Sequence, residues 1–348
     1  MDAKYNRIAT VIYSFCLVWF GTVESIAQYP GNKAPLGVDS RLEDSLSPRL
    51  TARTLEVFSS IPLSVPPFGF FGSPQCDATG RMFFEAGTPP SNDRIYLAIS
   101  ADGQRQTIYA LPKDILDQPH NTLAYLSAGG EVHFLAMLPG KSLKWLTFDE
   151  GGKLEHVVGL NAPTSLVMDS FAVTAGGYLM LLGYYPEGDK HSNVEGTTYR
   201  AIFSPSGDVV TQLPSERAAI AADSDPQRMR EVHVKTDGDH FYWTTGKIIY
   251  DLDSSGAVVR KIDIPKANES DQVLDIGMSG PMAEVTLASG PPWRTSYLVL
   301  NSITGDAYWL YLPPEGSHMK LACFDSKRGF TFLVYENKRL RFEQAILP

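Results

Sequence analysis

Two acidic side chains stand at matching positions of a repeated pattern, and together they could carry chemistry. Asp169 and Glu231 each lie seven residues before a turn glycine, and Ser73 and Thr122 hold the same position elsewhere in the chain. Two carboxylates at one site can bind a cation such as Ca²⁺, accept hydrogen bonds from sugar hydroxyls or move a proton. Because the four residues share a position, we expect them to line one rim of the molecule.

Two ring side chains could complete such a site. His233 follows Glu231 by two residues, so both side chains face the same side of an extended strand. Trp293 follows two prolines, and its ring could stack on a sugar or an aromatic ligand. The alternative is a hydrated rim, in which these carboxylates and rings serve only local packing and hydrogen bonding.

Motifs that identify common enzyme classes are absent from the sequence. It contains no Gly-x-Ser-x-Gly, His-Glu-x-x-His or Cys-x-x-Cys pattern and no phosphate-binding glycine loop. Asp251 to Gly256 resembles the start of a calcium-binding loop, but the later bidentate glutamate is missing. We therefore assign no cofactor, and Ca²⁺ held by Asp169 and Glu231 is the candidate metal.

The candidate residues belong to a pattern of about fifty residues that recurs six times. Each copy reads as short β-branched and aromatic strands separated by turns of Gly, Asp, Asn and Ser. The first turn of each copy contains Gly80, Gly129, Gly176, Gly238, Gly280 or Gly329. A fixed period of this length with four strands per copy is typical of a β-propeller.

We predict an all-β fold over residues 54–348, a six-bladed β-propeller with four-stranded antiparallel blades. The last copy has only three strands before the chain ends at Pro348. A strand over Thr54 to Ile61 can supply the fourth, which closes the ring and removes an exposed sheet edge. The candidate residues then lie where innermost strands begin, at the mouth of the central channel.

Two segments resemble blades of a known superfamily. Phe241 to Gly256 and Asp77 to Phe84 are similar to six-bladed propellers with NHL, TolB-like or Tyr-Trp-Thr-Asp repeats, although Thr245 replaces the aspartate of that phrase. The resemblance implies the propeller fold and an exported bacterial protein. Lactonases, lyases and peptide- or glycan-binding modules share this architecture, so the fold does not choose an activity.

Residues 1–27 are typical of an export signal. A short basic start precedes an apolar run from Ile8 to Phe20, and small residues precede Gln28. We expect cleavage before Gln28, a flexible leader over residues 28–53, location in the periplasm or outside the cell, and no insertion into the membrane. An uncleaved membrane anchor is the alternative. The net charge of −9 without a basic run argues against nucleic acid as a partner.

Outside the signal, cysteine occurs only at Cys76 and Cys323, on the predicted innermost strands of the first and last blades. Ring closure makes these strands neighbours. Counted from the turn glycines, however, the two residues are about two positions out of register. We therefore expect two buried thiols, with a disulfide as the alternative that export permits.

These patterns predict an exported, non-catalytic propeller that binds a protein, a glycan or a small molecule. The expected surface is the loop-rich face near blades three to five, because the longest loops share that face. They are Pro186 to Thr198, Pro214 to Gln227 and Ser289 to Thr295. The alternative is a metal-assisted, lactonase-like hydrolase or lyase with a carboxylate site at the channel mouth.

Overall fold

The computed structural model describes the following residues of the chain, all within the compact unit Ser45–Pro348: 50–54, 56–63, 69–88, 93–116, 122–138, 142–163, 166–187, 195–214, 217–218, 234–244, 246–265, 271–289, 294–311, 319–327, 329–336 and 339–346. Strands make up most of them, and α3 (Lys113–Leu116) is a single helical turn.

Six antiparallel sheets form the blades, and each runs from an innermost strand to an outermost strand. Blade one consists of β3 (Gly69–Cys76), β4 (Met82–Thr88), β5 (Asp93–Ile99) and β6 (Gln106–Tyr109), and blade two of β7 (Thr122–Leu126), β8 (Val132–Met137), β9 (Leu143–Phe148) and β10 (Leu154–Leu160). Blade three consists of β11 (Val167–Val173), β12 (Leu179–Glu187), β13 (Glu195–Phe203) and β14 (Val209–Gln212), and blade four of β16 (Val234–Asp237), β17 (His240–Thr244), β18 (Ile248–Leu252) and β19 (Val258–Asp263). Blade five consists of β20 (Gln272–Ser279), β21 (Met282–Ser289), β22 (Arg294–Asn301) and β23 (Ala307–Tyr311), and blade six includes β24 (Met319–Asp325), β25 (Gly329–Glu336) and β26 (Arg339–Ile346).

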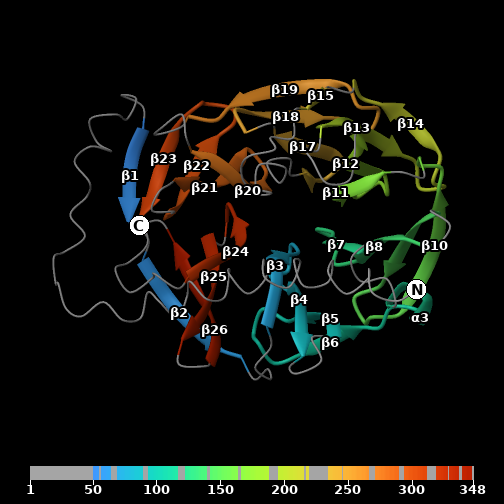
Figure 1. Cartoon of the computed structure of the whole chain (residues 1–348). Helices are drawn as coiled ribbons and strands as arrows, with labels where there is room; N and C mark the ends of the chain where they lie inside the picture. Colours follow the sequence, from blue (N-terminus) through green and yellow to red (C-terminus); the bar gives the residue numbers. More distant parts are fainter. Residues whose placement is uncertain are drawn as a thin grey trace, which may run out of the picture. The chain divides into compact units, whose positions relative to one another are not determined.

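The N-terminal strand closes the ring, as the sequence predicts. Strand β2 (Glu56–Pro62) pairs antiparallel with β26 and completes blade six as its outermost strand. Figure 1 shows the six sheets around a common centre, with β2 at the outer edge beside β26. The six-bladed propeller is therefore confirmed, and its ring is closed by the two ends of the domain.

A second N-terminal strand was not expected. Strand β1 (Leu50–Thr54) lies mostly within the segment read as a leader, yet it pairs in parallel with β23 at the outer edge of blade five. Only residue 55 separates it from β2, so the chain passes directly from the rim of blade five to the rim of blade six.

The repeated turns have a common chemical construction. A side-chain oxygen on the first turn residue accepts the backbone N–H four residues later: Asp77 from Arg81 at 3.0 Å, Ser127 from Glu131 at 3.1 Å and Thr174 from Tyr178 at 3.1 Å. Short polar side chains favour such turns because they replace a backbone hydrogen bond locally. The turns between the first two and the last two strands of each blade share one side of the ring, here called the turn face. The remaining connections share the opposite side, the loop face.

In blades two, three and four the glycine between the third and fourth strands is required by packing as well as by backbone angle. Gly207 has φ +90°, and a β-carbon there would lie 2.8 Å from Cγ1 of Val158 on the outermost strand of the preceding blade. Gly152 has φ +84°, and its β-carbon would lie 2.9 Å from the Ile108 carbonyl oxygen of blade one. This turn therefore packs directly on the neighbouring blade, which explains why glycine recurs at the position.

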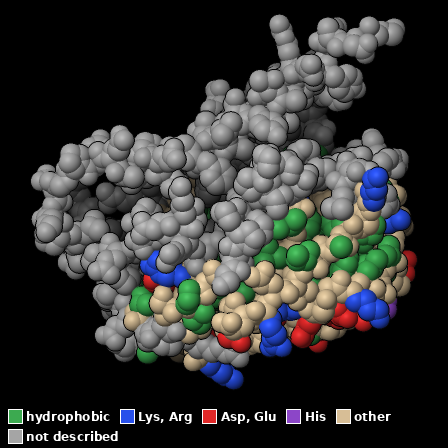
Figure 2. All heavy atoms as spheres, turned by 90° about the horizontal axis from the view of Figure 1, so that it is seen from below, with side chains coloured by type: hydrophobic (Ala, Val, Ile, Leu, Met, Phe, Trp, Pro, Cys, Tyr) green, Lys and Arg blue, Asp and Glu red, His purple; other side chains and the backbone are tan. Residues whose placement is uncertain are grey.

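Apolar side chains fill the spaces between blades. Phe134 of blade two meets Tyr96 and Phe83 of blade one edge to face, with ring centroids 4.8 Å and 6.2 Å apart. On the outermost strands, Ile108 and Val259 are 64% and 56% exposed. Figure 2 shows apolar side chains mixed with Lys, Arg, Asp and Glu at the surface. Charged neighbours of this kind protect outer sheet edges from pairing with other chains.

Cys76 and Cys323 form a disulfide, so the expectation of two free thiols was wrong. Their Cα atoms lie 5.5 Å apart, within the usual range for a bridge. The bond joins the innermost strands of blades one and six, and the apolar cluster around it includes Phe84 and Phe342. The ring is therefore closed by a covalent bond at its inner edge and by strand pairing at its outer edge.

The error came from the length of one turn. In blade one the N–H of Asp77 donates to the carbonyl of Arg81, and the turn glycine, Gly80, is the third residue after Asp77. In blade six Asp325 pairs with Gly329, so glycine is the fourth residue after the aspartate. Counting back from glycine therefore overstated the offset between the cysteines by one position, and a bulge next to Cys323 changes the register further.

Candidate functional site

The structure describes three of the six predicted site residues. Thr122 begins β7, Asp169 lies in β11, and Ser73 lies in β3, all on innermost strands. The other three, Glu231, His233 and Trp293, lie outside the described residues. The carboxylate pair of Asp169 and Glu231, and Ca²⁺ binding by it, stay predictions.

Thr122 is buried at the loop-face end of its strand. Its side chain belongs to a residue that is only 6% exposed, and its hydroxyl makes no hydrogen bond to the residues that the structure describes. A buried hydroxyl without a partner destabilises a fold by about 1–3 kcal/mol. The loop-face end of this innermost strand therefore holds a buried polar group without a partner among the described residues.

Asp169 occupies an irregular position in blade three. The pairing of β11 with β12 shifts between Met168 and Ser170, so Asp169 is the extra residue of a β-bulge. Bulges redirect a side chain out of the regular alternation of a strand. Burial, and to a smaller extent the Asp169 carboxylate, raises the pKa of the nearby Tyr184 hydroxyl.

Blade three extends toward the loop face beyond the predicted strand ends. Residues 186–198 were expected as a loop, but β12 and β13 continue as a hairpin as far as the pair Glu187 and Glu195. Strand β15 (Arg217–Ala218) adds to this extension by pairing with Gly196 and Thr197. The described part of blade three therefore extends farther on the loop face than the sequence predicts.

A hydrogen-bonded bridge crosses the channel near the turn face. Tyr125 of blade two and Thr236 of blade four place their hydroxyl oxygens 2.7 Å apart, although blade three lies between them in the ring. The Thr236 hydroxyl donates to the carbonyl of Val173 at 3.0 Å, so Tyr125 is the donor to Thr236. This bridge joins the innermost strands of three blades.

Gln75 makes an equivalent link between blades one and two. Its amide nitrogen donates to the carbonyl of Ala124 at 3.1 Å, and its amide oxygen accepts from the N–H of Leu126 at 2.8 Å. The Gln75 side chain thus makes the same pair of hydrogen bonds to β7, one donated and one accepted, that the backbone of a neighbouring strand would make. We refer to Gln75, Tyr125 and Thr236 together as the channel floor.

Replacing Tyr125 by phenylalanine tests whether the floor holds blades together. The change removes one buried hydroxyl while the Thr236 hydroxyl keeps its bond to Val173, so we expect a loss of about 1 kcal/mol in the free energy of unfolding. Urea denaturation measures it. Tyr250→Phe is the matched control, because the Tyr250 ring packs on Trp243 without a hydroxyl hydrogen bond among the described contacts. Equal effects of the two changes would contradict a bridging role.

Lys235 and Asp275 form an ion pair in the channel wall, one layer nearer the loop face than the floor. The Lys235 ammonium lies 3.2 Å from the Asp275 carboxylate, so the pair joins blade four to blade five. Both side chains are about one-quarter exposed. Burial is the largest influence and opposes the charge on Lys235, but Asp275, Tyr125 and Glu284 together raise the pKa of the ammonium above its ordinary value. The sequence prediction missed Lys235, although a basic residue on an innermost strand was a visible signal.

Glu284 lies close to this ion pair on β21, within blade five. It is 3% exposed, and one carboxyl oxygen accepts a hydrogen bond from Thr286 at 2.8 Å. Burial raises the pKa of Glu284 to about 8, with the Thr286 hydrogen bond lowering it, the Asp275 carboxylate raising it and Lys235 lowering it. Glu284 therefore holds a proton at neutral pH. A glutamate inside an otherwise apolar strand was the sequence signal for it.

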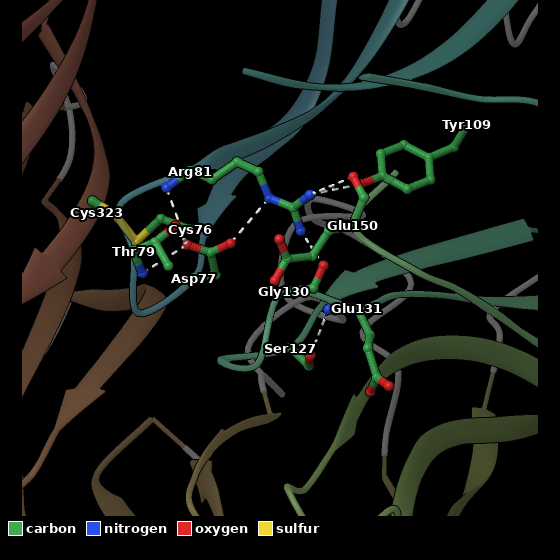
Figure 3. Close-up of polar contacts among 10 residues, drawn as sticks. All are labelled: Cys76, Asp77, Thr79, Arg81, Tyr109, Ser127, Gly130, Glu131, Glu150 and Cys323. Carbon is green, nitrogen blue, oxygen red and sulfur yellow. Dashed lines mark hydrogen bonds and ion pairs between the residues drawn. A yellow bond between two sulfur atoms is a disulfide. The ribbon is translucent and has the colours of Figure 1, made fainter. Parts of the chain in front are cut away.

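A second polar cluster, on the turn face, is structural. Figure 3 shows Arg81 reaching from blade one toward Tyr109 and Glu150, with the disulfide close by. The guanidinium bonds to Asp77 at 3.0 Å, to the Tyr109 hydroxyl at 3.1 Å and to the carbonyl of Glu150 at 2.9 Å, and it also donates to the carbonyl of Gly130. Two of these partners belong to blade one and two belong to blade two, so the Arg81 side chain holds the two blades together.

In the described part of the chain, no group of three or more His, Cys, Asp and Glu side chains could hold a metal ion. None of the helices in these residues is both long and apolar enough to cross a membrane.

Comparison with known proteins identifies neither a family nor an activity for the chain. No protein-family model matches the chain, and no curated protein matches it.

Among solved structures it is similar to the Neurospora crassa Pan2 WD40 domain, with 11% identity, 85% of this chain and 97% of that chain covered, and a TM-score of 0.44. It is also similar to YCF48 bound to a D1 peptide, with 11% identity, coverage of 86% and 99%, and a TM-score of 0.43. Oligogalacturonate lyase from Vibrio parahaemolyticus aligns at 9% identity, coverage of 85% and 97%, and a TM-score of 0.44. The chain is therefore a six-bladed β-propeller by its own strand pairing.

Proposed function

We propose that this protein is an exported, non-catalytic binding propeller that takes a hydroxyl-rich ligand, the end of a glycan, into its channel from the loop face. The observation that carries the proposal is the buried hydroxyl of Thr122 on the innermost strand β7, which has no hydrogen-bond partner among the described residues. Such a group lowers stability unless a bound molecule supplies its hydrogen bond.

The chemistry of the channel wall supports a sugar in preference to an apolar molecule. Below Thr122 the wall offers an ammonium donor at Lys235 and a carboxylate acceptor at Asp275, both partly exposed. Sugar hydroxyls both donate and accept, so they can bond to each kind of group. The Tyr125–Thr236 bridge lies toward the turn-face end, which favours entry from the loop face.

Two features support export. The apolar run at the N-terminus precedes a site that fits signal cleavage before Gln28. The Cys76–Cys323 disulfide is of a kind that forms and persists in oxidising compartments.

The test replaces Thr122 by valine, which keeps the shape of the side chain and removes the hydroxyl. We expect the variant to be at least as stable as the wild type but to bind about tenfold more weakly, since one hydrogen bond to the ligand is lost. An array of purified neutral oligosaccharides identifies the probe, and isothermal titration with that saccharide measures the affinity.

The matched control is Thr147→Val in the same blade. The Thr147 hydroxyl is buried but bonds to Nδ1 of His133 at 3.1 Å, so this change should reduce stability and leave saccharide affinity unchanged. Two results would count against the proposal: no saccharide on the array binds, or Thr122→Val binds as well as the wild type. Capture of a protein partner in place of a saccharide would also overturn the glycan assignment.

A further inference from the structure

Glu284 is an unusual element of the channel wall, because an acid sits in the middle of a buried strand. Its neighbours along β21, Ala283 and Val285, are fully buried and apolar. The residue opposite Glu284 on the innermost strand is Gly277. A β-carbon on Gly277 would lie 3.4 Å from a Glu284 carboxyl oxygen, so this carboxyl group lies directly beside Gly277 of the innermost strand.

The groups around Glu284 come from three blades. Asp275 of β20 and Lys235 of β16 act on it from the channel side. Tyr297 of β22 lies on the other side, and burial together with Glu284 raises the Tyr297 pKa to about 12. The Tyr297 hydroxyl accepts a hydrogen bond at 3.4 Å from the N–H of Leu321, on the innermost strand of blade six. Blade six otherwise presents apolar rings to this region, including Phe324 and Phe332.

We propose that Glu284 is a proton-sensitive element that keeps blades five and six packed while it is neutral and loosens their seam when it loses its proton. The inference goes beyond the proposed function and does not depend on the ligand. A carboxylate at this place would be buried, with Thr286 as its described hydrogen-bond donor. The negative Asp275 would oppose its charge, the Lys235 ammonium would favour it more weakly, and the apolar rings of blade six would give it no hydrogen bond. An ionised group in such surroundings is strongly disfavoured.

The direction of the pH effect follows from proton binding in the two states. The Glu284 pKa is about 8 in the folded protein, against 4.5 for an ordinary glutamate. Between these values the folded state binds more protons than the unfolded state, so stability falls as pH rises. The contribution is fully present below about pH 4.5 and is lost above about pH 8.

The experiment compares melting temperatures of wild type and Glu284→Gln from pH 5 to pH 9. Glutamine keeps the shape of the neutral acid and cannot ionise. We expect the wild type to lose about 5 °C more than the variant across this range, so that the variant is the more stable protein at pH 9. Glu155→Gln makes the same chemical change at an exposed strand position and should follow the wild type.

Parallel pH curves for wild type and Glu284→Gln would overturn the proposal. Should the variant fail to fold, infrared difference spectroscopy of the wild type gives an independent answer. The proposal requires the band of a protonated carboxylic acid at pH 7 that disappears as the pH is raised to 9. Absence of that band at pH 7 would overturn it equally.

Discussion

Replacing both Cys76 and Cys323 by serine is expected to lower the free energy of unfolding by about 4–5 kcal/mol. The disulfide joins residues 247 positions apart, and a bond that closes so long a loop removes much of the conformational freedom of the unfolded chain. Guanidinium denaturation of the oxidised wild type and of the double variant measures the difference. A loss of this size exceeds what any single hydrogen bond of the channel floor contributes.

Reduction provides the matching control. A dithiol reductant should destabilise the wild type by a similar amount and leave the double-serine variant unchanged. An equal response in both proteins would show that the reductant acts elsewhere. If the double variant were as stable as the wild type, the bond would have no role in closing the ring.

Replacing Gly207 by alanine is expected to cost about 3 kcal/mol. An alanine there must adopt a positive φ and must also fit its β-carbon against the backbone of Gly159 and the side chain of Val158, which belong to the preceding blade. The backbone term alone amounts to about 1 kcal/mol, and the remainder comes from moving one blade against the next. Urea denaturation of the purified variant measures the loss.

Gly305→Ala separates the two terms. Gly305 holds the corresponding turn position in blade five with φ +75°, but nothing lies within 4 Å of an added β-carbon. This variant should therefore lose only about 1 kcal/mol. If the Gly207 and Gly305 variants lost the same stability, packing of the turn on the neighbouring blade would not explain the recurring glycine.

The repeat predicted the fold because each blade uses the same local chemistry. A polar first residue, a glycine with positive φ and short β-branched strands recur in every copy, and these are signals that a sequence displays directly. The closing strand was also predictable, since six copies left blade six with one strand too few. Strand β1 could not be predicted from the sequence, because its parallel pairing with β23 depends on where blade five lies in the folded ring and not on a local sequence signal.

The site was harder to predict because counting along a strand fails at bulges. The position seven residues before Gly280 is the apolar Val273. In the structure the pairing of β20 shifts between Val273 and Asp275, and Asp275 forms the ion pair with Lys235. Glu284 was missed for a different reason: it belongs to a second strand, and only the fold brings it beside the first.

The path of β2 has a consequence for how the protein is made. Its partner β26 lies at the other end of the domain, so β2 is synthesised early but can pair only after β26, the last strand, has been made. Until then blade six lacks its outer edge, and Cys76 lacks its partner Cys323. The ring thus cannot be completed before β26 has been made, because the contacts that close it span nearly the whole length of the described domain.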